Sequence, residues 1–149
     1  MDVKEAIPKS IATVMKGTYV YVKTDKLEKP DIHFMVSKDK DEITVVTEKA
    51  NVEKLKALEI VGDYKLIEFK PAVPFQTVGF LAKIAEVIAN QGMNILIVST
   101  FSKDYIMIKE ELCEKGILAL KNVGFPIEYE KYLLWIWKIY IKVIIFRRI

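Results

Sequence analysis

The chain has 149 residues, of which 52% are hydrophobic and 29% are charged. This composition is too apolar for a disordered chain, and the length suits one domain or two small halves that share a core. The formal net charge is +3, but five of the 23 basic residues and none of the 20 acidic residues lie in residues 131–149. The rest of the chain therefore has a formal net charge of −2. Because nucleic-acid binding requires a basic surface, we expect no nucleic-acid partner.

The first half of the chain is predicted to be rich in β-structure. Residues 18–23, TYVYVK, alternate in the manner of a strand. Residues 32–37 and 43–48 flank a charged loop and are predicted to form a hairpin. Residues 52–58 carry apolar side chains at three-residue steps, which predicts a short helix.

The second half is predicted to follow a βαββαβ order. Thr77 suits the N-cap of a helix, and Gly92 suits its left-handed C-terminal end. Gly116 lies inside a second predicted helix, where glycine costs about 1 kcal/mol relative to alanine. The order predicts an antiparallel four-stranded sheet with two helices on one face. The predicted elements are strand 64–70, helix 77–91, strands 94–99 and 104–109, helix 110–122 and a last strand at about 125–130.

The chain divides into three predicted segments. Residues 1–62 have a comparable strand pattern, but the connection 24–31 is too short to hold a first helix, so this half looks truncated. Residues 63–130 form the complete βαββαβ unit, and residues 131–149 form an apolar, basic tail.

The N-terminal sequence indicates where the protein is located, and the cysteine count limits its thiol chemistry. The N-terminal sequence MDVKEAIPKSIATVMK has acidic residues, a proline and no continuous apolar stretch, so it is not a secretory signal and we expect a cytoplasmic protein. The single cysteine, Cys113, excludes an internal disulfide and a multi-cysteine metal site. Its position in a predicted helix favours a small buried side chain over a reactive thiol.

Two runs of sequence carry a resemblance to a known family. Residues 37–46, SKDKDEITVV, are similar to a strand, polar turn and D-E-I-S-V-V hairpin. The pattern Phe75-x-x-Val78-Gly79-Phe80-Leu81-Ala82, followed by ILIVSTFSKDYI at residues 95–106, is similar to a run G-I-L-A … I-S-T-x-x-T-D-Y-I-L-V-K. Both runs resemble the ACT domain, in the branch related to aspartate-kinase regulatory domains and cytosolic arginine sensors. Lys103 departs from this pattern, which commonly has Thr there.

The resemblance implies a fold and a function. The fold is α+β, a ferredoxin-like βαββαβ ACT domain preceded by a truncated ACT-like, β-rich half. The function is that of a non-catalytic regulatory module that binds an amino acid or a similar small ligand. Binding at a domain or subunit interface would shift an assembly equilibrium, so we expect a homo-oligomer.

Two segments are candidate ligand contacts. The first-turn N–H groups of the helix after Thr77, with the positive end of its dipole, attract a carboxylate. Gly79 would let a ligand approach the backbone, although it can equally serve close packing of helix on strand. Ser99 and Thr100 favour turns on their own account, and Asp104 is the better candidate to meet a cation. The candidate ligand-binding residues are Phe75, Gln76, Thr77, Val78, Gly79, Ser99, Thr100 and Asp104.

Catalysis, metal binding and cofactor binding have little support in the sequence. The single histidine, His33, lies in a predicted strand without a convincing nucleophile partner. The acidic loop with Asp39, Asp41 and Glu42 lacks the spacing and the glycine of an EF-hand. The chain also lacks a glycine-rich phosphate loop and the H-E-x-x-H and G-x-S-x-G motifs. We therefore expect neither an enzyme nor a bound metal or cofactor.

The tail supports an alternative function. Residues 132–146, YLLWIWKIYIKVIIF, are shorter than the about 20 residues of a membrane-spanning helix and contain two lysines. As a helix the tail would place Lys131, Lys138 and Lys142 on one face, a pattern of membrane-surface helices. As a strand it would present an unbroken apolar face, which requires a pairing partner. A reading-frame artefact is a third interpretation. The alternative function is therefore a membrane-surface or protein-interaction adaptor that works through residues 131–149.

Overall fold

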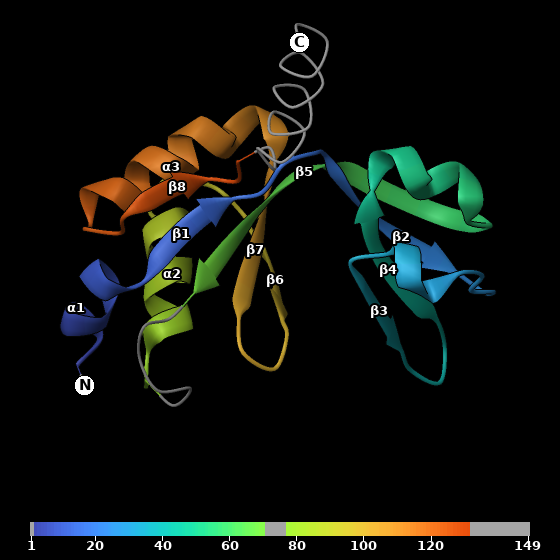
Figure 1. Cartoon of the computed structure of the whole chain (residues 1–149), viewed down its shortest axis with the longest axis horizontal. Coiled ribbons are helices and arrows are strands. Elements are labelled where there is room, and N and C mark those ends of the chain that lie inside the picture. The colour runs from blue at the N-terminus through green and yellow to red at the C-terminus, as the bar shows by residue number, and fades with distance from the viewer. Residues whose placement is uncertain (1, 71–76, 132–149) are drawn as a thin grey trace, which may run out of the picture.

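The computed structural model describes residues 2–70 and 77–131. In this part of the chain, eight strands form one branched, curled sheet, accompanied by short helices in the first half and longer ones in the second (Figure 1). The helices, with η denoting 3₁₀ helices, are α1 (Val3–Ala6), η1 (Ile7–Lys9), η2 (Pro30–Ile32), η3 (Lys49–Lys54), α2 (Phe80–Ala89), η4 (Glu110–Leu112) and α3 (Cys113–Asn122). The strands are β1 (Ile11–Val14), β2 (Tyr19–Thr24), β3 (Met35–Lys38), β4 (Ile43–Glu48), β5 (Ala57–Lys70), β6 (Leu96–Ser99), β7 (Asp104–Lys109) and β8 (Ile127–Tyr129).

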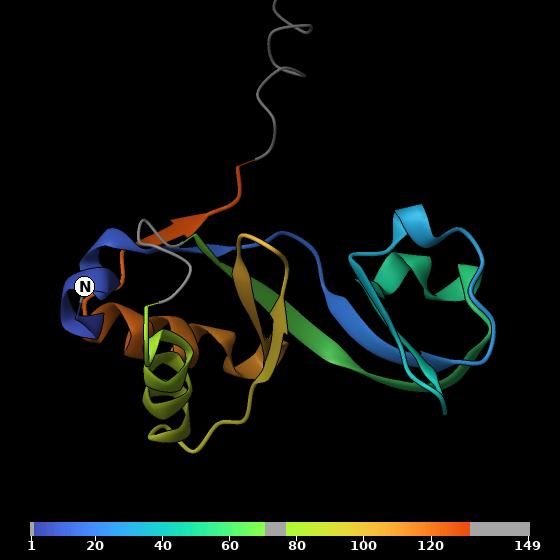
Figure 2. The ribbon, with the colours of Figure 1, turned by 90° about the horizontal axis from the view of Figure 1, so that it is seen from below.

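The long strand β5 belongs to both halves of the molecule. Its first part, from Ala57 to Tyr64, pairs with β2. Its second part, from Tyr64 to Lys70, pairs with β7 on one side and, over its last residues, with β1 on the other. Figure 2 shows β5 running from one lobe to the other. The expected division between residues 62 and 63 falls within this strand.

The first half is an antiparallel sheet in the order β3-β4-β2-β5. The predicted hairpin is present, but its first strand begins at Met35 rather than Ile32. Pro30 opens the 3₁₀ turn η2, and His33 follows this turn instead of lying in a strand. The helix predicted over residues 52–58 was also wrong. Lys49–Lys54 form η3, while Leu58 already lies in β5, because pairing with β2 overrides a weak helical spacing.

The second half confirms the βαββαβ order, with β5, α2, β6, β7, α3 and β8 in sequence. Its sheet has the order β6-β7-β5-β1-β8, so it has five strands instead of the predicted four. The additional strand is β1, which pairs antiparallel with β5 and parallel with β8. Strand β1 was not predicted, because a four-residue strand has too short a pattern to recognise.

The two helices of the second half begin later than predicted. The N-cap of α2 is Gly79 in the left-handed region with a φ of 85°, so Thr77 does not cap the helix and its first residue is Phe80. The predicted end is confirmed, since Gly92 follows the helix with a φ of 72°. Before α3, Glu110–Leu112 form the separate 3₁₀ turn η4, so the α-helix begins at Cys113.

The main core lies between the second-half sheet and its helices. The rings of Phe69 in β5, Phe80 in α2 and Phe125 contact one another edge to face, with centroids 5.4–6.2 Å apart. Gly116 is buried in α3, and a Cβ atom there would lie 2.8 Å from Cδ1 of Ile108 in β7. The glycine thus allows a close approach of helix to sheet, which accounts for a residue that is otherwise unfavourable in a helix.

The opposite face of the sheet forms a second core that links the two halves. Phe34 precedes β3, and its ring contacts Tyr105 in β7 at 4.9 Å and Tyr19 in β2 at 6.1 Å between centroids. Both tyrosines are buried. Because the sheet curls, a residue of the first half can cover a strand of the second (Figure 2).

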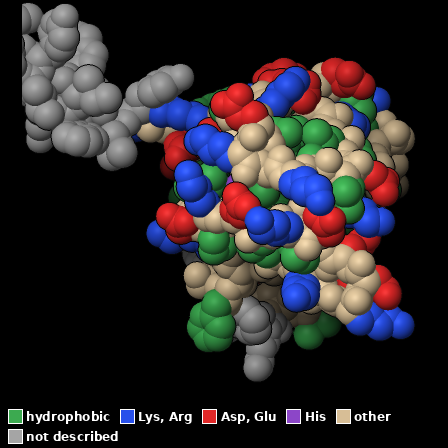
Figure 3. Space-filling view, turned by 90° about the vertical axis from the view of Figure 1, so that its right-hand side faces the viewer, with side chains coloured by type: hydrophobic (Ala, Val, Ile, Leu, Met, Phe, Trp, Pro, Cys, Tyr) green, Lys and Arg blue, Asp and Glu red, His purple; other side chains and the backbone are tan. Residues whose placement is uncertain are grey.

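The surface of the described residues carries mixed charges. On the face seen in Figure 3, Lys side chains are interspersed with Asp and Glu side chains. None of the described helices is long and apolar enough to cross a membrane. The interpretations of the tail concern residues 132–149, which lie outside the described residues.

Candidate ligand-binding site

The predicted residues before α2 form a turn at the helix start. Val78 is 91% exposed, and Gly79 has the positive φ that glycine adopts without strain. Among the described residues, a Cβ atom on Gly79 would meet only Val3, at 4.0 Å, so packing against these residues does not require the glycine. Thr77 is half-buried, and Phe75 and Gln76 lie outside the described residues.

The predicted residues between β6 and β7 close a hairpin. The hydroxyl of Ser99 donates to Oδ1 of Asp104 at 2.6 Å. The backbone N–H of Thr100 donates to the carbonyl oxygen of Lys103 at 2.9 Å. These side chains therefore have the turn-forming role that their residue types favour, and the Asp104 carboxylate is held at the first residue of β7.

The two predicted segments lie at the same end of the second-half sheet. Asp104 is the cross-strand partner of Phe69, so the two side chains lie on the same face of the sheet. The ring of Phe69 is 6.2 Å from that of Phe80, which directly follows Gly79. In Figure 1 the start of α2 and the turn between β6 and β7 both lie at the lower side of the second half. Phe69 is thus a common neighbour of two segments that are about 25 positions apart in sequence.

Three further residues anchor this hairpin on the opposite face of the sheet. Nζ of Lys103 lies 2.8 Å from Oε2 of Glu68, and the hydroxyl of Tyr105 donates to the same oxygen at 3.0 Å. The Glu68 side chain is only 13% exposed. Burial, together with the hydrogen bond to Glu68, raises the pKa of Tyr105 above its ordinary value. The sequence prediction missed this group; its only signal was a carboxylate within an apolar strand.

The chemistry of this end of the sheet suits binding of a zwitterion. The start of α2 offers the positive end of a helix dipole, which favours a carboxylate. Asp104 offers a carboxylate, which favours an ammonium group. Within residues 2–70 and 77–131, no group of three or more acidic, histidine or cysteine side chains is placed to hold a metal ion.

The other two residues considered for chemical reactivity, His33 and Cys113, contact or pack among buried side chains. Nδ1 of His33 lies 2.9 Å from the hydroxyl oxygen of Thr47, which is fully buried. Cys113 is 5% exposed, and burial raises the pKa of its thiol to about 11. Since the thiolate is the reactive form, Cys113 is a packed side chain at neutral pH.

The fold of the second half is that of a ferredoxin-like α+β domain. Residues 51–122 match the family model described as the ACT domain, and the chain therefore contains an ACT domain. The match includes the second of the two sequence runs, at residues 75–82 and 95–106, and confirms the resemblance to the ACT domain. No curated protein matches the sequence.

Solved structures share the fold over most of the chain. A Vibrio cholerae protein of unknown function, described as a possible transport protein, has a TM-score of 0.71 at 18% identity and covers 82% of this chain and 95% of its own. An Agrobacterium tumefaciens protein has a TM-score of 0.71 at 17% identity, covering 84% and 96%. The regulatory subunit of aspartate kinase from Thermus flavus has a TM-score of 0.55 at 13% identity, covering 79% and 98%. These likenesses concern the fold, which the chain shares with a regulatory subunit of aspartate kinase.

Proposed function

We propose that the protein is a non-catalytic, cytoplasmic regulatory module that binds an amino acid or a similar small ligand. The observation that supports this proposal most strongly is the match of residues 51–122 to the ACT-domain family model. Its likeness to a regulatory subunit of aspartate kinase supports the same class of function.

In this proposal the ligand binds at the end of the second-half sheet. Its carboxylate meets the first turn of α2 beside Gly79, and its ammonium group meets Asp104. The meeting of these two segments through Phe69 supports one site rather than two. The residues of the proposed site are Phe75, Gln76, Thr77, Val78, Gly79, Ser99, Thr100 and Asp104.

The same end of the sheet supports assembly as a homo-oligomer. Val78 beside the helix start and Phe101 in the hairpin turn are 91% and 93% exposed. Large apolar side chains that flank a site in this way suit cover by a second subunit. A ligand bound at such a contact shifts the assembly equilibrium by its difference in affinity for the two states.

A thermal-shift screen tests the proposal. The full chain is mixed with each of the twenty proteinogenic amino acids at millimolar concentration. A ligand present at 100 times its Kd stabilises the folded state by about 2.7 kcal/mol, so binding raises the melting temperature. A melting temperature that none of the twenty compounds raises would contradict the proposal. For a compound that does, Asp104→Asn should reduce the shift.

The adaptor alternative depends on residues 132–149, which the structure does not describe, and the described contacts add no support for it. Liposome co-sedimentation of the full chain and of residues 1–130 separates the two functions. Binding to vesicles only by the full chain would favour the adaptor.

A further inference from the structure

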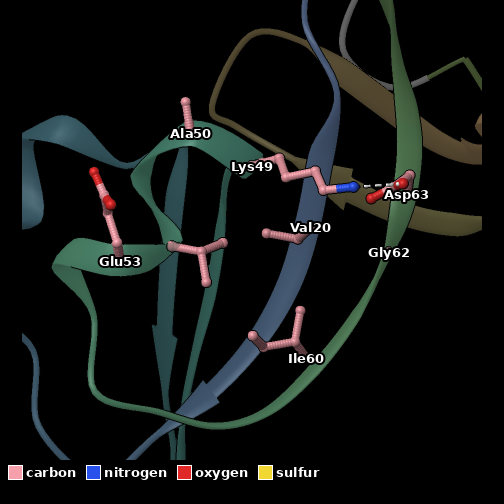
Figure 4. Close-up of a pocket in the computed structure, with 8 residues that line it drawn as sticks. Val20, Lys49, Ala50, Glu53, Ile60, Gly62 and Asp63 are labelled. Atoms are coloured by element: carbon pink, nitrogen blue, oxygen red, sulfur yellow. Dashed lines mark hydrogen bonds and ion pairs between the residues drawn. The ribbon is translucent and has the colours of Figure 1, made fainter.

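The first half of the molecule has a depression of its own, separate from the site at the end of the second-half sheet. Its volume is about 780 Å³. Val20 from β2 and Ile60 and Asp63 from β5 form one side, and Lys49, Val52 and Glu53 from η3 form the other. Figure 4 shows Val20 and Ile60 between the two strands and η3.

The depression exists because a short helix covers this part of the sheet. In chain order, η3 lies between β4 and β5 as α3 lies between β7 and β8. The six residues of η3 form a 3₁₀ helix, whereas α3 is an α-helix of ten residues. Ile60 pairs with Val22, whose side chain is fully buried in the first-half core, so both lie on the face that η3 covers. Ile60 is nevertheless 50% exposed.

A pair of opposite charges lies beside this uncovered aliphatic surface. Nζ of Lys49 and Oδ2 of Asp63 are 2.8 Å apart, and Figure 4 shows the two side chains pointing toward each other. The Lys49 and Asp63 side chains are 61% and 39% exposed. An exposed ion pair contributes little to stability, so a ligand can exchange partners with both groups at small cost.

We propose that this depression binds an aliphatic α-amino acid. The ammonium group of the ligand pairs with Asp63, its carboxylate pairs with Lys49, and its branched side chain covers the exposed Ile60 and the half-buried Val52. In an α-amino acid both charged groups are attached to one carbon, so they can meet two side chains that already touch. A fatty acid would meet only Lys49 and an alkylamine only Asp63, so an α-amino acid makes one more charge-assisted contact than either. The inference rests on the proposed function for the class of ligand, but it names a different site.

Methyl NMR of the full chain, labelled at Ile, Leu and Val, tests the location. Titration with leucine, isoleucine and valine should shift the methyl signals of Val20, Val52 and Ile60. N-acetylleucine, which lacks the ammonium group, and leucinamide, which lacks the carboxylate, should shift them only weakly. Leucine-induced shifts confined to Val78 and other methyls near the start of α2 would overturn this inference and leave the proposed function standing.

The absence of any shift with the three aliphatic amino acids would also overturn the inference. The proposed function would then be decided separately by the screen of all twenty amino acids.

A matched pair of variants tests the role of the charge pair. Lys49→Met should weaken leucine binding about tenfold, as expected for the loss of one charge-assisted hydrogen bond. The control is Lys56→Met, which removes an exposed ion pair with Asp25 in the same half, at 3.3 Å, outside the depression. It should leave leucine binding unchanged. Equal affinity in the wild type and Lys49→Met would contradict the proposed ligand geometry, and unperturbed methyl signals elsewhere would show that the variant is folded.

Discussion

At the scale of single residues, Cys113 gives the protein a defined dependence on pH. Burial raises the pKa of its thiol to about 11, from an ordinary value of 9.0. As the pH rises, the unfolded chain therefore loses this proton before the folded chain does. The contribution of the neutral thiol to stability is fully present below about pH 9 and is lost as the pH rises toward 11.

We predict that Cys113→Ala flattens this dependence. Between pH 9 and 10, the free energy of unfolding of the wild type should fall more steeply than that of the variant, by up to about 1.4 kcal/mol per pH unit. Urea unfolding at closely spaced pH values measures the difference. The range ends at pH 10 because burial also raises the pKa of Tyr19 and Tyr105, which affect stability at higher pH. Parallel slopes for the two proteins would contradict the prediction.

The limits of sequence prediction are also visible in single residues. The strand that contains Glu68 was predicted over residues 64–70, but its contact with Tyr105 follows from the pairing register of β5 and β7. Phe34 likewise reaches Tyr105 only because the sheet curls. Such contacts join residues far apart in sequence, and periodicity carries no information about them.

At the scale of elements, the two left-handed glycines of α2 form a matched pair. Gly79 precedes the helix with a φ of 85°, and Gly92 follows it with a φ of 72°. A Cβ atom would have no neighbour within 4 Å at Gly92 and only Val3 at Gly79. Valine at either position should therefore destabilise the fold by a similar amount, about 1–2 kcal/mol, from backbone strain.

We predict that only one member of this pair affects ligand binding. If an amino acid binds at the start of α2, Gly79→Val abolishes its thermal shift, whereas Gly92→Val retains it. Melting curves with and without the amino acid that stabilises the wild type measure both effects. A shift that survives in Gly79→Val would remove the helix start from the proposed site.

The packing of α3 on β7 gives a second prediction for elements. Gly116→Val should lower the free energy of unfolding by about 2–4 kcal/mol, because its side chain would enter space occupied by Ile108. The control is Leu118→Val, at a side chain of the same helix that is 58% exposed, where the change should be below about 0.5 kcal/mol. Chemical denaturation of the two variants checks this contrast, and equal effects would mean that α3 can move away from the sheet without cost.

Some helices and strands were predicted well from the sequence and others were missed, for physical reasons. Long segments with a clear period, such as those of α2 and β7, were found with small errors at their ends. The candidate site segments were proposed because glycine and turn-forming residues mark them. Their meeting through Phe69 was not predictable, since it depends on tertiary packing. Strand β1 was missed because its position is fixed by its partners β5 and β8 rather than by its own four residues.

At the scale of the whole molecule, β1 makes the second half dependent on the first. This strand lies between β5 and β8, and it is the only strand that pairs with β8 among the described residues. Ala12 in β1 and Ala6 before it are fully buried in the main core. Residues 63–130 therefore contain every element of a βαββαβ unit but lack one strand of the sheet that this unit forms.

We predict that residues 63–130 alone do not fold stably, whereas residues 1–131 do. Without β1, the backbone groups of β5 and β8 that it pairs lose their partners, and the apolar surface that covers Ala6 and Ala12 becomes exposed. Proton–nitrogen NMR spectra of the two fragments provide the measurement: dispersed signals for 1–131 and collapsed signals for 63–130. Adding a peptide of residues 1–18 should restore dispersion, because it supplies β1. A well-dispersed spectrum and cooperative unfolding of 63–130 by itself would instead establish that segment as an autonomous domain.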